Sequence, residues 1–473
     1  MRFFTVEKIE RLLRDVRAAV TRGSVDIPRF KFRQTPFSDD AIAGAERPEY
    51  DDRGWDDFHV GGAWGGYDFT AWFRAAVPIP PDWRDRKLAL RLLPGPPDGG
   101  ESTAEALLYV EGRPLQAFDA WHSEAWLPPE LSARGEIHIA LKAWSGVLGV
   151  PERRRFETAQ LVWLDEGAER LVALADTLLG TVRVLPETDL RRGMILQALN
   201  EAFLAVDFAR PGSDGFYASV ADAARGLERA VDGWREMGEL KPRVVALGHA
   251  HIDMAWLWRL AHTREKAART FTTVLHLMRQ YPEYRYVHSS PQLYKFLKED
   301  YPEIFARVKE RIAAGQWEIT GATWVEPDTN LTGGESLVRQ FLFGSRWVRQ
   351  EFGIEMQLLW LPDVFGYSAA LPQIIAKSGV RYFLTSKISW SQFNRFPHDT
   401  FRWRGLDGTE VLTHFLTTPE AGTSMFTYNS QMRPVDVQGT WDSYRQRDVN
   451  DELLILFGWG DGGGGPTQTM LDL

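Results

Sequence analysis

The chain has 473 residues, of which 44% are hydrophobic and 25% charged, so we expect a globular protein of roughly two to four domains. Its net charge of −9 argues against nucleic acid as a partner. The chain has 0 cysteines, which excludes thiolate chemistry and leaves His and carboxylates as metal ligands. No apolar stretch approaches the length of a membrane span, and charged residues come too early for a signal peptide, so we expect a cytoplasmic protein without a membrane partner.

Residues 1–155 are predicted to form a helix and an antiparallel β-sandwich that serves as an accessory domain. Apolar residues follow helical spacing between Val6 and Val20. The pattern then changes to alternation, which predicts strands over residues 71–77, 87–92, 106–110 and 136–142. Turns rich in Gly and Pro separate these runs, as is typical of a small sandwich. Such a domain can bind sugar or be purely structural, and no ligand residue is assigned to it.

Residues 156–240 return to a helical pattern and are interpreted as a linker region. Helices are predicted over residues 161–185, 190–208 and 217–237. From residue 241 to 473, strands predicted at 244–247, 286–288, 317–320, 357–361, 381–385 and 453–457 alternate with helices at 263–279, 335–351 and 371–378. This alternation predicts an α/β domain with a parallel sheet, open or closed, and helices outside it.

The first strand of this domain ends in a cluster of potential metal ligands. Val244–Leu247 is predicted as a short buried strand that stops at Gly248, and His251 and Asp253 follow. Side chains two residues apart in extended backbone point the same way, so these two can offer a nitrogen and an oxygen to one ion such as zinc. His249 has the same parity and would join or support them. The alternative interpretation is that Asp253 caps the next helix.

Two further aspartates follow predicted strands. Asp363 is held between Pro362 and a Phe-Gly pair, where a carboxylate can complete a metal site or attack a sugar carbon; the alternative is a helix cap for a helix near Ala369. Asp461 lies in a run of glycines that lacks the Lys-Ser/Thr ending of a phosphate-binding loop. Beside Trp459, its carboxyl group is a candidate proton donor, or it is simply a turn residue.

Four motifs lie at or near the ends of these strands. They are residues 248–256 (GHAHIDMAW), 360–368 (WLPDVFGYS), 394–403 (NRFPHDTFRW) and 460–467 (GDGGGGPT). Taken in this order, they resemble the motifs of the α-mannosidases of glycoside hydrolase family 38, with the best match to the cytosolic and vacuolar branch. The resemblance is specific from about residue 243 onward and weaker before it.

The resemblance implies a (β/α)7 barrel that holds one zinc ion and hydrolyses α-mannosidic bonds in oligosaccharides with retention. It implies that His251, Asp253 and Asp363 are zinc ligands, that Asp363 is also the nucleophile, and that Asp461 is the general acid/base. Substrate-binding residues implied in the same way are Trp256, Asp328, Lys387 and Trp390.

The resemblance also implies a chain longer than this one, so that residues 1–473 would be an N-terminal fragment with its barrel truncated. The family's fourth zinc ligand, a His, would lie in the later segment. Two other functions stay open: a His-x-Asp metal hydrolase of another kind, such as a polysaccharide deacetylase, and an inactive carbohydrate-binding fragment. A homo-oligomer is also open.

Overall fold

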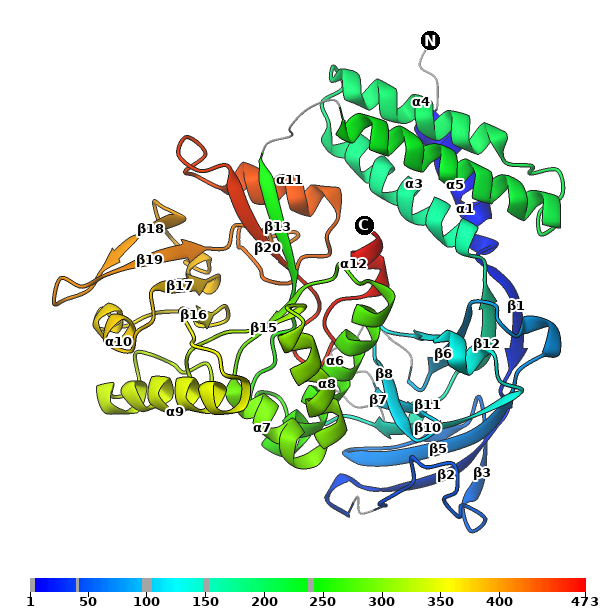
Figure 1. Cartoon of the computed structure of the whole chain (residues 1–473), viewed down its shortest axis with the longest axis horizontal. Helices are drawn as coiled ribbons and strands as arrows, with labels where there is room; N and C mark the ends of the chain where they lie inside the picture. Colours follow the sequence, from blue (N-terminus) through cyan, green and yellow to red (C-terminus); the bar gives the residue numbers. More distant parts are fainter. Residues whose placement is uncertain (1–4, 40–41, 96–103, 148–152, 237–241) are drawn as a thin grey trace. The chain divides into compact units, whose positions relative to one another are not determined.

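A computed structural model describes residues 5–39, 42–95, 104–147, 153–236 and 242–473 (Figure 1). The chain divides into two compact units, one of residues 1–240 with 472–473 and one of residues 241–471. Among the described residues, none of the helices combines the length and apolar character that crossing a bilayer requires.

The first unit contains the predicted antiparallel β-sandwich, which is confirmed. One sheet has four strands in the order β1-β12-β6-β9, the other has six in the order β3-β2-β5-β10-β7-β8, and β11 pairs with β4. Alternate residues of β10, such as Ile137, Ile139 and Leu141, are buried in the core between the sheets. The strands are β1 (Thr21–Asp26), β2 (Arg29–Pro36), β3 (Asp56–His59), β4 (Ala63–Trp64), β5 (Phe69–Pro78), β6 (Leu88–Leu93), β7 (Glu105–Val110), β8 (Arg113–Phe118), β9 (Glu124–Leu127), β10 (Glu136–Trp144), β11 (Arg154–Arg155) and β12 (Thr158–Leu164).

Four helices of the first unit pack together around a second apolar core (Figure 1). The helical segments are α1 (Thr5–Ala18), η1 (Phe37–Asp39), η2 (Pro81–Trp83), α2 (Pro129–Ser132), α3 (Glu166–Val184), α4 (Leu190–Ala205) and α5 (Asp214–Arg235). In α1, Ile9, Leu13 and Val16 form the buried stripe that the sequence predicts.

The helix predicted over residues 161–185 is wrong in its first turn, because Thr158–Leu164 forms β12. Its apolar run fits either period, but pairing with β6 and β1 makes it a central strand. The helix begins only after Asp165, whose carboxylate accepts a hydrogen bond from the Ala168 amide at 2.9 Å. Residue 237, at the end of another predicted helix, lies outside the described residues.

The second unit is an α/β domain, as predicted. Its strands are β13 (Arg243–Gly248), β14 (Tyr286–His288), β15 (Trp317–Ile319), β16 (Leu358–Leu361), β17 (Tyr382–Thr385), β18 (Thr400–Arg404), β19 (Glu410–Phe415) and β20 (Glu452–Phe457). Its helical segments are α6 (Leu260–Gln280), α7 (Pro291–Asp300), α8 (Pro302–Ala313), α9 (Gly334–Phe352), α10 (Leu371–Lys377), η3 (Lys387–Ser389), α11 (Pro434–Ser443) and α12 (Gln468–Asp472). All strand pairs are parallel except the hairpin of β18 and β19.

The strands of this unit form two four-stranded sheets, in the orders β15-β14-β13-β20 and β16-β17-β19-β18. Parallel bridges between Gly321 and Leu359, and between Ser430 and Phe457, continue the pairing beyond the named strands. The named strands of residues 242–473 do not pair into one closed sheet, so the seven-stranded barrel is not confirmed. The strand predicted over 244–247 is present, but Val245 is 42% exposed rather than buried. The other described residues shield only part of β13 from solvent.

Helix α9 packs directly on the backbone that follows β15. A Cβ atom at Gly344 would lie 2.5 Å from the Thr323 carbonyl carbon and 2.7 Å from the Ala322 carbonyl oxygen. These neighbours are backbone atoms and cannot move aside as a side chain would. Gly344 therefore permits the close approach of helix and loop.

We expect Gly344→Ala to lower the free energy of unfolding by about 1–3 kcal/mol through overpacking. Gly334→Ala is the matched control, since nothing lies within 4 Å of a Cβ atom at that end of the same helix. The control variant should be as stable as the parent chain or slightly more stable. Urea unfolding followed by tryptophan fluorescence measures both changes, and equal stability of the two variants would contradict the packing argument.

Candidate functional site

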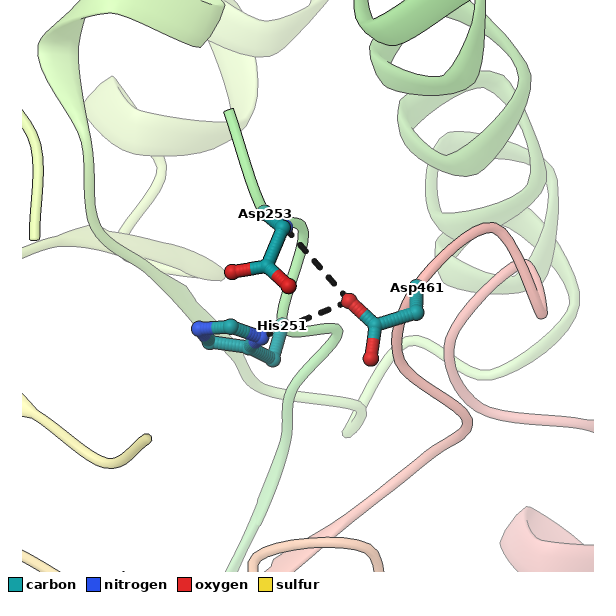
Figure 2. Close-up of side chains that lie close together, drawn as sticks. All are labelled: His251, Asp253 and Asp461. Atoms are coloured by element: carbon teal, nitrogen blue, oxygen red, sulfur yellow. Dashed lines mark hydrogen bonds and ion pairs between the residues drawn. The ribbon is translucent and has the colours of Figure 1, made fainter. Parts of the chain in front are cut away.

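Three donor side chains, His251, Asp253 and Asp461, lie together at the ends of two neighbouring strands (Figure 2). Each offers one ligand atom, and the three atoms lie within 4.8 Å of one another. His251 and Asp253 follow β13, and Asp461 follows β20. These strands pair in parallel up to Gly248 and Phe457, so their carboxyl ends leave the sheet at the same point.

Glycines let the loop after β20 lie against the loop after β13. The Asp461 amide donates to the His251 carbonyl oxygen at 2.6 Å. A Cβ atom at Gly460 would lie 3.0 Å from that same oxygen. Asp461 itself has a φ of 55°, in the left-handed region that non-glycine residues rarely adopt, and Gly462 follows with a φ of 93°. This strained backbone fixes where the Asp461 carboxylate emerges.

His251 is buried between carboxylates. Its Nε2 lies 3.1 Å from Glu326 Oε2, and its Nδ1 lies 3.6 Å from Asp461 Oδ1. Burial alone would lower the pKa of His251, but the neighbouring carboxylates of Glu326 and Asp461 outweigh burial and hold it well above the usual value. These carboxylates thus favour the protonated, positively charged form of the His251 ring.

Asp253 completes the group with a desolvated carboxylate. Burial raises the pKa of Asp253 to about 6, the His251 charge opposes this rise, and the carboxylates of Asp461, Asp363 and Glu326 add to it. Its backbone amide lies 3.4 Å from Asp461 Oδ1. Asp253 does not cap the next helix, because the residue that precedes α6 is Arg259.

The donor set fits a divalent metal ion. It offers one imidazole nitrogen and two carboxylate oxygens, which zinc accepts at about 2.0–2.2 Å. Two such ligands of one ion lie at most about 4.4 Å apart, so the 3.6 Å between His251 Nδ1 and Asp461 Oδ1 needs no rearrangement. His251 Nδ1 is also buried without a hydrogen-bond partner in the described chain, as expected of an atom that binds an ion.

His249 lies two residues before His251 and is not one of the three donors. Its side chain is buried, and its Nε2 accepts a hydrogen bond from Trp360 Nε1 at 3.2 Å. Burial, with the neighbouring His288 and His251, lowers the pKa of His249 well below its usual value. It therefore packs as a neutral ring.

Asp363 is held separately by two donors. Tyr428 Oη donates to Asp363 Oδ1 at 2.8 Å, and Lys387 Nζ lies 3.1 Å from the same oxygen. The Lys387 ammonium also lies 3.9 Å from the centre of the Trp390 ring and 5.5 Å from that of Phe365. Asp363 does not cap α10, whose preceding residue is Ala370 without a side-chain cap.

Trp256 and Asp328, the remaining predicted substrate residues, have different surroundings. The Trp256 side chain is 59% exposed and contacts Trp258 edge to face. Asp328 Oδ1 accepts hydrogen bonds from the Asn330 and Leu331 amides at 2.8 Å each, so this carboxylate stabilises a turn.

Two residues at the site, Glu326 and Tyr428, are not among those predicted from the sequence. Glu326 lies two residues before Asp328 in the same loop. No sequence pattern indicates which of these two carboxylates reaches the site. Tyr428 follows β19, a strand that was not predicted, although the Asp407-Gly408 pair between β18 and β19 is a hairpin signal.

We predict that zinc binding weakens as pH falls through 6, because protons on Asp253 and His251 compete with the ion. Lowering the pH from 7.5 to 5 should reduce the apparent affinity at least about tenfold, since the pKa of Asp253 is about 6. The thermal shift caused by zinc at the two pH values measures this change.

The matched variants for this test are Asp253→Asn, which should lose the zinc shift, and Asp442→Asn, which should keep it. Asp442 is exposed and accepts a hydrogen bond from Gln438 Nε2, which an asparagine oxygen can also accept. A zinc shift that is independent of pH, or that persists in Asp253→Asn, would contradict the donor assignment.

Each of the two units contains a segment that matches a known protein family. Residues 241–473 match the glycosyl hydrolases family 38 N-terminal domain, and residues 35–172 match an α-mannosidase jelly roll domain. Alpha-mannosidase 2C1 of Homo sapiens is 36% identical, covering 87% of this chain and 39% of that protein. Alpha-mannosidase G of Dictyostelium discoideum is 33% identical, covering 88% and 38%, and the alpha-mannosidase of Saccharomyces cerevisiae is 33% identical, covering 85% and 38%.

The chain thus spans about two fifths of the length of the curated relatives it matches. The two family matches fall in different units, and the match over residues 241–473 includes the loops that carry the donor group. Residues 241–473 of this chain belong to glycoside hydrolase family 38.

Proposed function

We propose that this chain carries the catalytic groups of a zinc-dependent, retaining α-mannosidase that hydrolyses α-mannosidic bonds in oligosaccharides. The relatives named above are α-mannosidases, which supports the reaction. The observation that carries the proposal is the His251, Asp253 and Asp461 group in a family 38 domain.

In this proposal Asp363 is the nucleophile. Tyr428 and Lys387 both donate to its Oδ1, which fixes the carboxylate and directs Oδ2 to the substrate. Oδ2 forms a bond to the anomeric carbon of mannose while the bond from that carbon to the leaving oxygen breaks. Asp461 donates a proton to the leaving oxygen. It then takes a proton from water, which attacks the anomeric carbon and releases Asp363.

His251 and Asp253 would hold the zinc ion, whose positive charge, when it is bound, would orient sugar hydroxyls and favour an oxocarbenium-like ring. The third ligand is open between two carboxylates. The family resemblance favours Asp363, whereas the donor distances group Asp461 with the pair.

Zinc titrations of Asp363→Asn and Asp461→Asn distinguish these two assignments. We expect Asp363→Asn to weaken zinc binding at least about tenfold, because a lost ligand costs more than a lost neighbouring charge. Asp461→Asn should keep most of the affinity while losing turnover. The reverse order of affinities would make Asp461 the ligand and leave the acid/base role to another group.

The proposed substrate site is lined by aromatic side chains and a cation. Trp256 and Trp390 are both more than a third exposed and offer faces on which the C–H groups of a mannose ring can pack. Lys387, held over Trp390, and the more distant Asp328 would bind hydroxyl groups. This arrangement supports a mannose-containing oligosaccharide as the substrate.

We also infer that the two sheets of the second unit belong to one (β/α)7 barrel, supported by the bridges at Gly321 and Ser430. The domain boundaries near residues 155 and 240 and the cytoplasmic location stay predictions from the sequence. So do the absence of a nucleic-acid or membrane partner and a homo-oligomeric state.

The nucleophile can be tested by covalent trapping. A fluorinated mannosyl fluoride that reacts quickly and hydrolyses slowly should add one glycosyl mass to the peptide that contains Asp363. Asp363→Asn should take no label and lose at least about 1,000-fold in hydrolysis of an aryl α-mannoside. Asp442→Asn, with its exposed carboxylate, should keep both properties.

Two outcomes would contradict the proposal. Turnover of an acetylated sugar without any covalent adduct would favour a deacetylase that uses metal-activated water. Sugar binding that survives Asp363→Asn, without turnover by the parent chain, would favour the carbohydrate-binding alternative.

A further inference from the structure

Glu326 makes contacts that the proposed reaction does not require of it. It lies in the loop after β15, and both of its carboxylate oxygens are engaged. Oε2 lies 3.1 Å from His251 Nε2, and Oε1 accepts a hydrogen bond from Ser289 Oγ at 2.8 Å. Ser289 follows β14, so the ends of three adjacent strands of one sheet meet at this carboxylate.

This contact determines which nitrogen of His251 faces the donor group. With Nε2 turned toward Glu326, Nδ1 points to Asp461 and Asp253 (Figure 2). A neutral imidazole carries one proton, and a carboxylate at 3.1 Å keeps that proton on Nε2 as its acceptor. The Nδ1 lone pair then faces the position where a metal ion fits.

Hydrogen bonds to helix α9 hold the backbone just before Glu326. The Val325 amide donates to Gln340 Oε1 at 3.0 Å, and the Trp324 amide donates to the Gln340 carbonyl oxygen at 3.0 Å. Gln340 lies on α9, the helix whose Gly344 packs on this same loop. The side chain is largely buried, 14% exposed against 3% for His251, so little water competes for the contact.

We propose that Glu326 is a positioning residue that fixes His251 as an Nδ1 metal ligand by accepting the Nε2 proton. The inference rests on the metal site of the proposed function. Carboxylates that accept the second proton of a ligating histidine orient the ring and strengthen the bond to the ion. A purely structural ion pair would stabilise the fold equally well with either nitrogen facing the donor group.

Zinc affinity, measured by competition with a chelator, tests the proposal in the 473-residue chain. Glu326→Ala should bind zinc about 10–100-fold more weakly than the parent chain. Glu326→Gln should lose less than the alanine variant, because its amide oxygen can still accept the Nε2 proton. Glu318→Gln is the control, since Glu318 is an exposed residue on β15 between two buried ones.

A second measurement reads the histidine directly. In ¹H–¹⁵N spectra of the zinc complex with labelled histidine, the ring proton of His251, identified by its loss in His251→Gln, should be attached to Nε2. It should exchange with water faster in Glu326→Ala. Melting curves of the metal-free variants in EDTA show that each one folds.

Each result separates this inference from the function on which it rests. A parent chain that binds no zinc would contradict the metal site itself and this inference with it. A parent chain that binds one zinc ion, together with an alanine variant within about threefold of its affinity, would contradict only the role of Glu326. A proton on Nδ1 in the zinc complex would do the same.

Discussion

The parallel pairing of β13 with β20 is the constraint on which the site depends. It brings together two loops that are about 200 residues apart in the sequence. The His249 amide donates to the Phe457 carbonyl oxygen, and the Asp461 amide donates to the His251 carbonyl oxygen. A Cβ atom at Gly458 would lie 2.2 Å from the His249 carbonyl oxygen, so a larger residue does not fit at that contact. The sequence therefore uses its run of glycines to place a carboxylate beside a histidine, and the chemistry of the site follows from this contact.

Four further strands of this unit are each followed by one of the polar groups. β14 leads to Ser289, β15 to Glu326, β16 to Asp363 and β17 to Lys387. Because β13, β14, β15 and β20 run parallel in one sheet, and β16 and β17 run parallel in the other, their carboxyl ends supply the polar groups while their apolar residues pack beneath. Fold and site are thus specified by the same segments: a short apolar run makes the strand, and a residue in the loop after it makes the contact.

Much of this arrangement can be read from the sequence, and the exceptions have physical causes. His251, Asp253 and Asp461 are recognisable because strong strand signals precede them. The last four residues of β12, Leu161–Leu164, were assigned to a helix because so short an apolar run fits both periods, and only pairing with β6 and β1 decides between them. Glu326 could not be preferred over Asp328, since a turn carboxylate and a buried one look alike in sequence; the anchoring of the loop by Gln340 makes the difference.

The electrostatics of the cluster explain why its residues act together. Four carboxylates, those of Asp253, Glu326, Asp363 and Asp461, face two cationic groups, His251 and Lys387, so the cluster carries a formal charge of −2 when both are protonated. Like charges about 4 Å apart repel by about 4 kcal/mol at an effective dielectric constant of 20. Burial is the main cause of the raised pKa of Asp253, and the neighbouring carboxylates add to it. In the proposed metal site a divalent ion would relieve the repulsion and leave the carboxylates ionised, whereas a proton relieves it only by neutralising one of the donors. The charges that crowd this cluster would therefore favour binding of the ion.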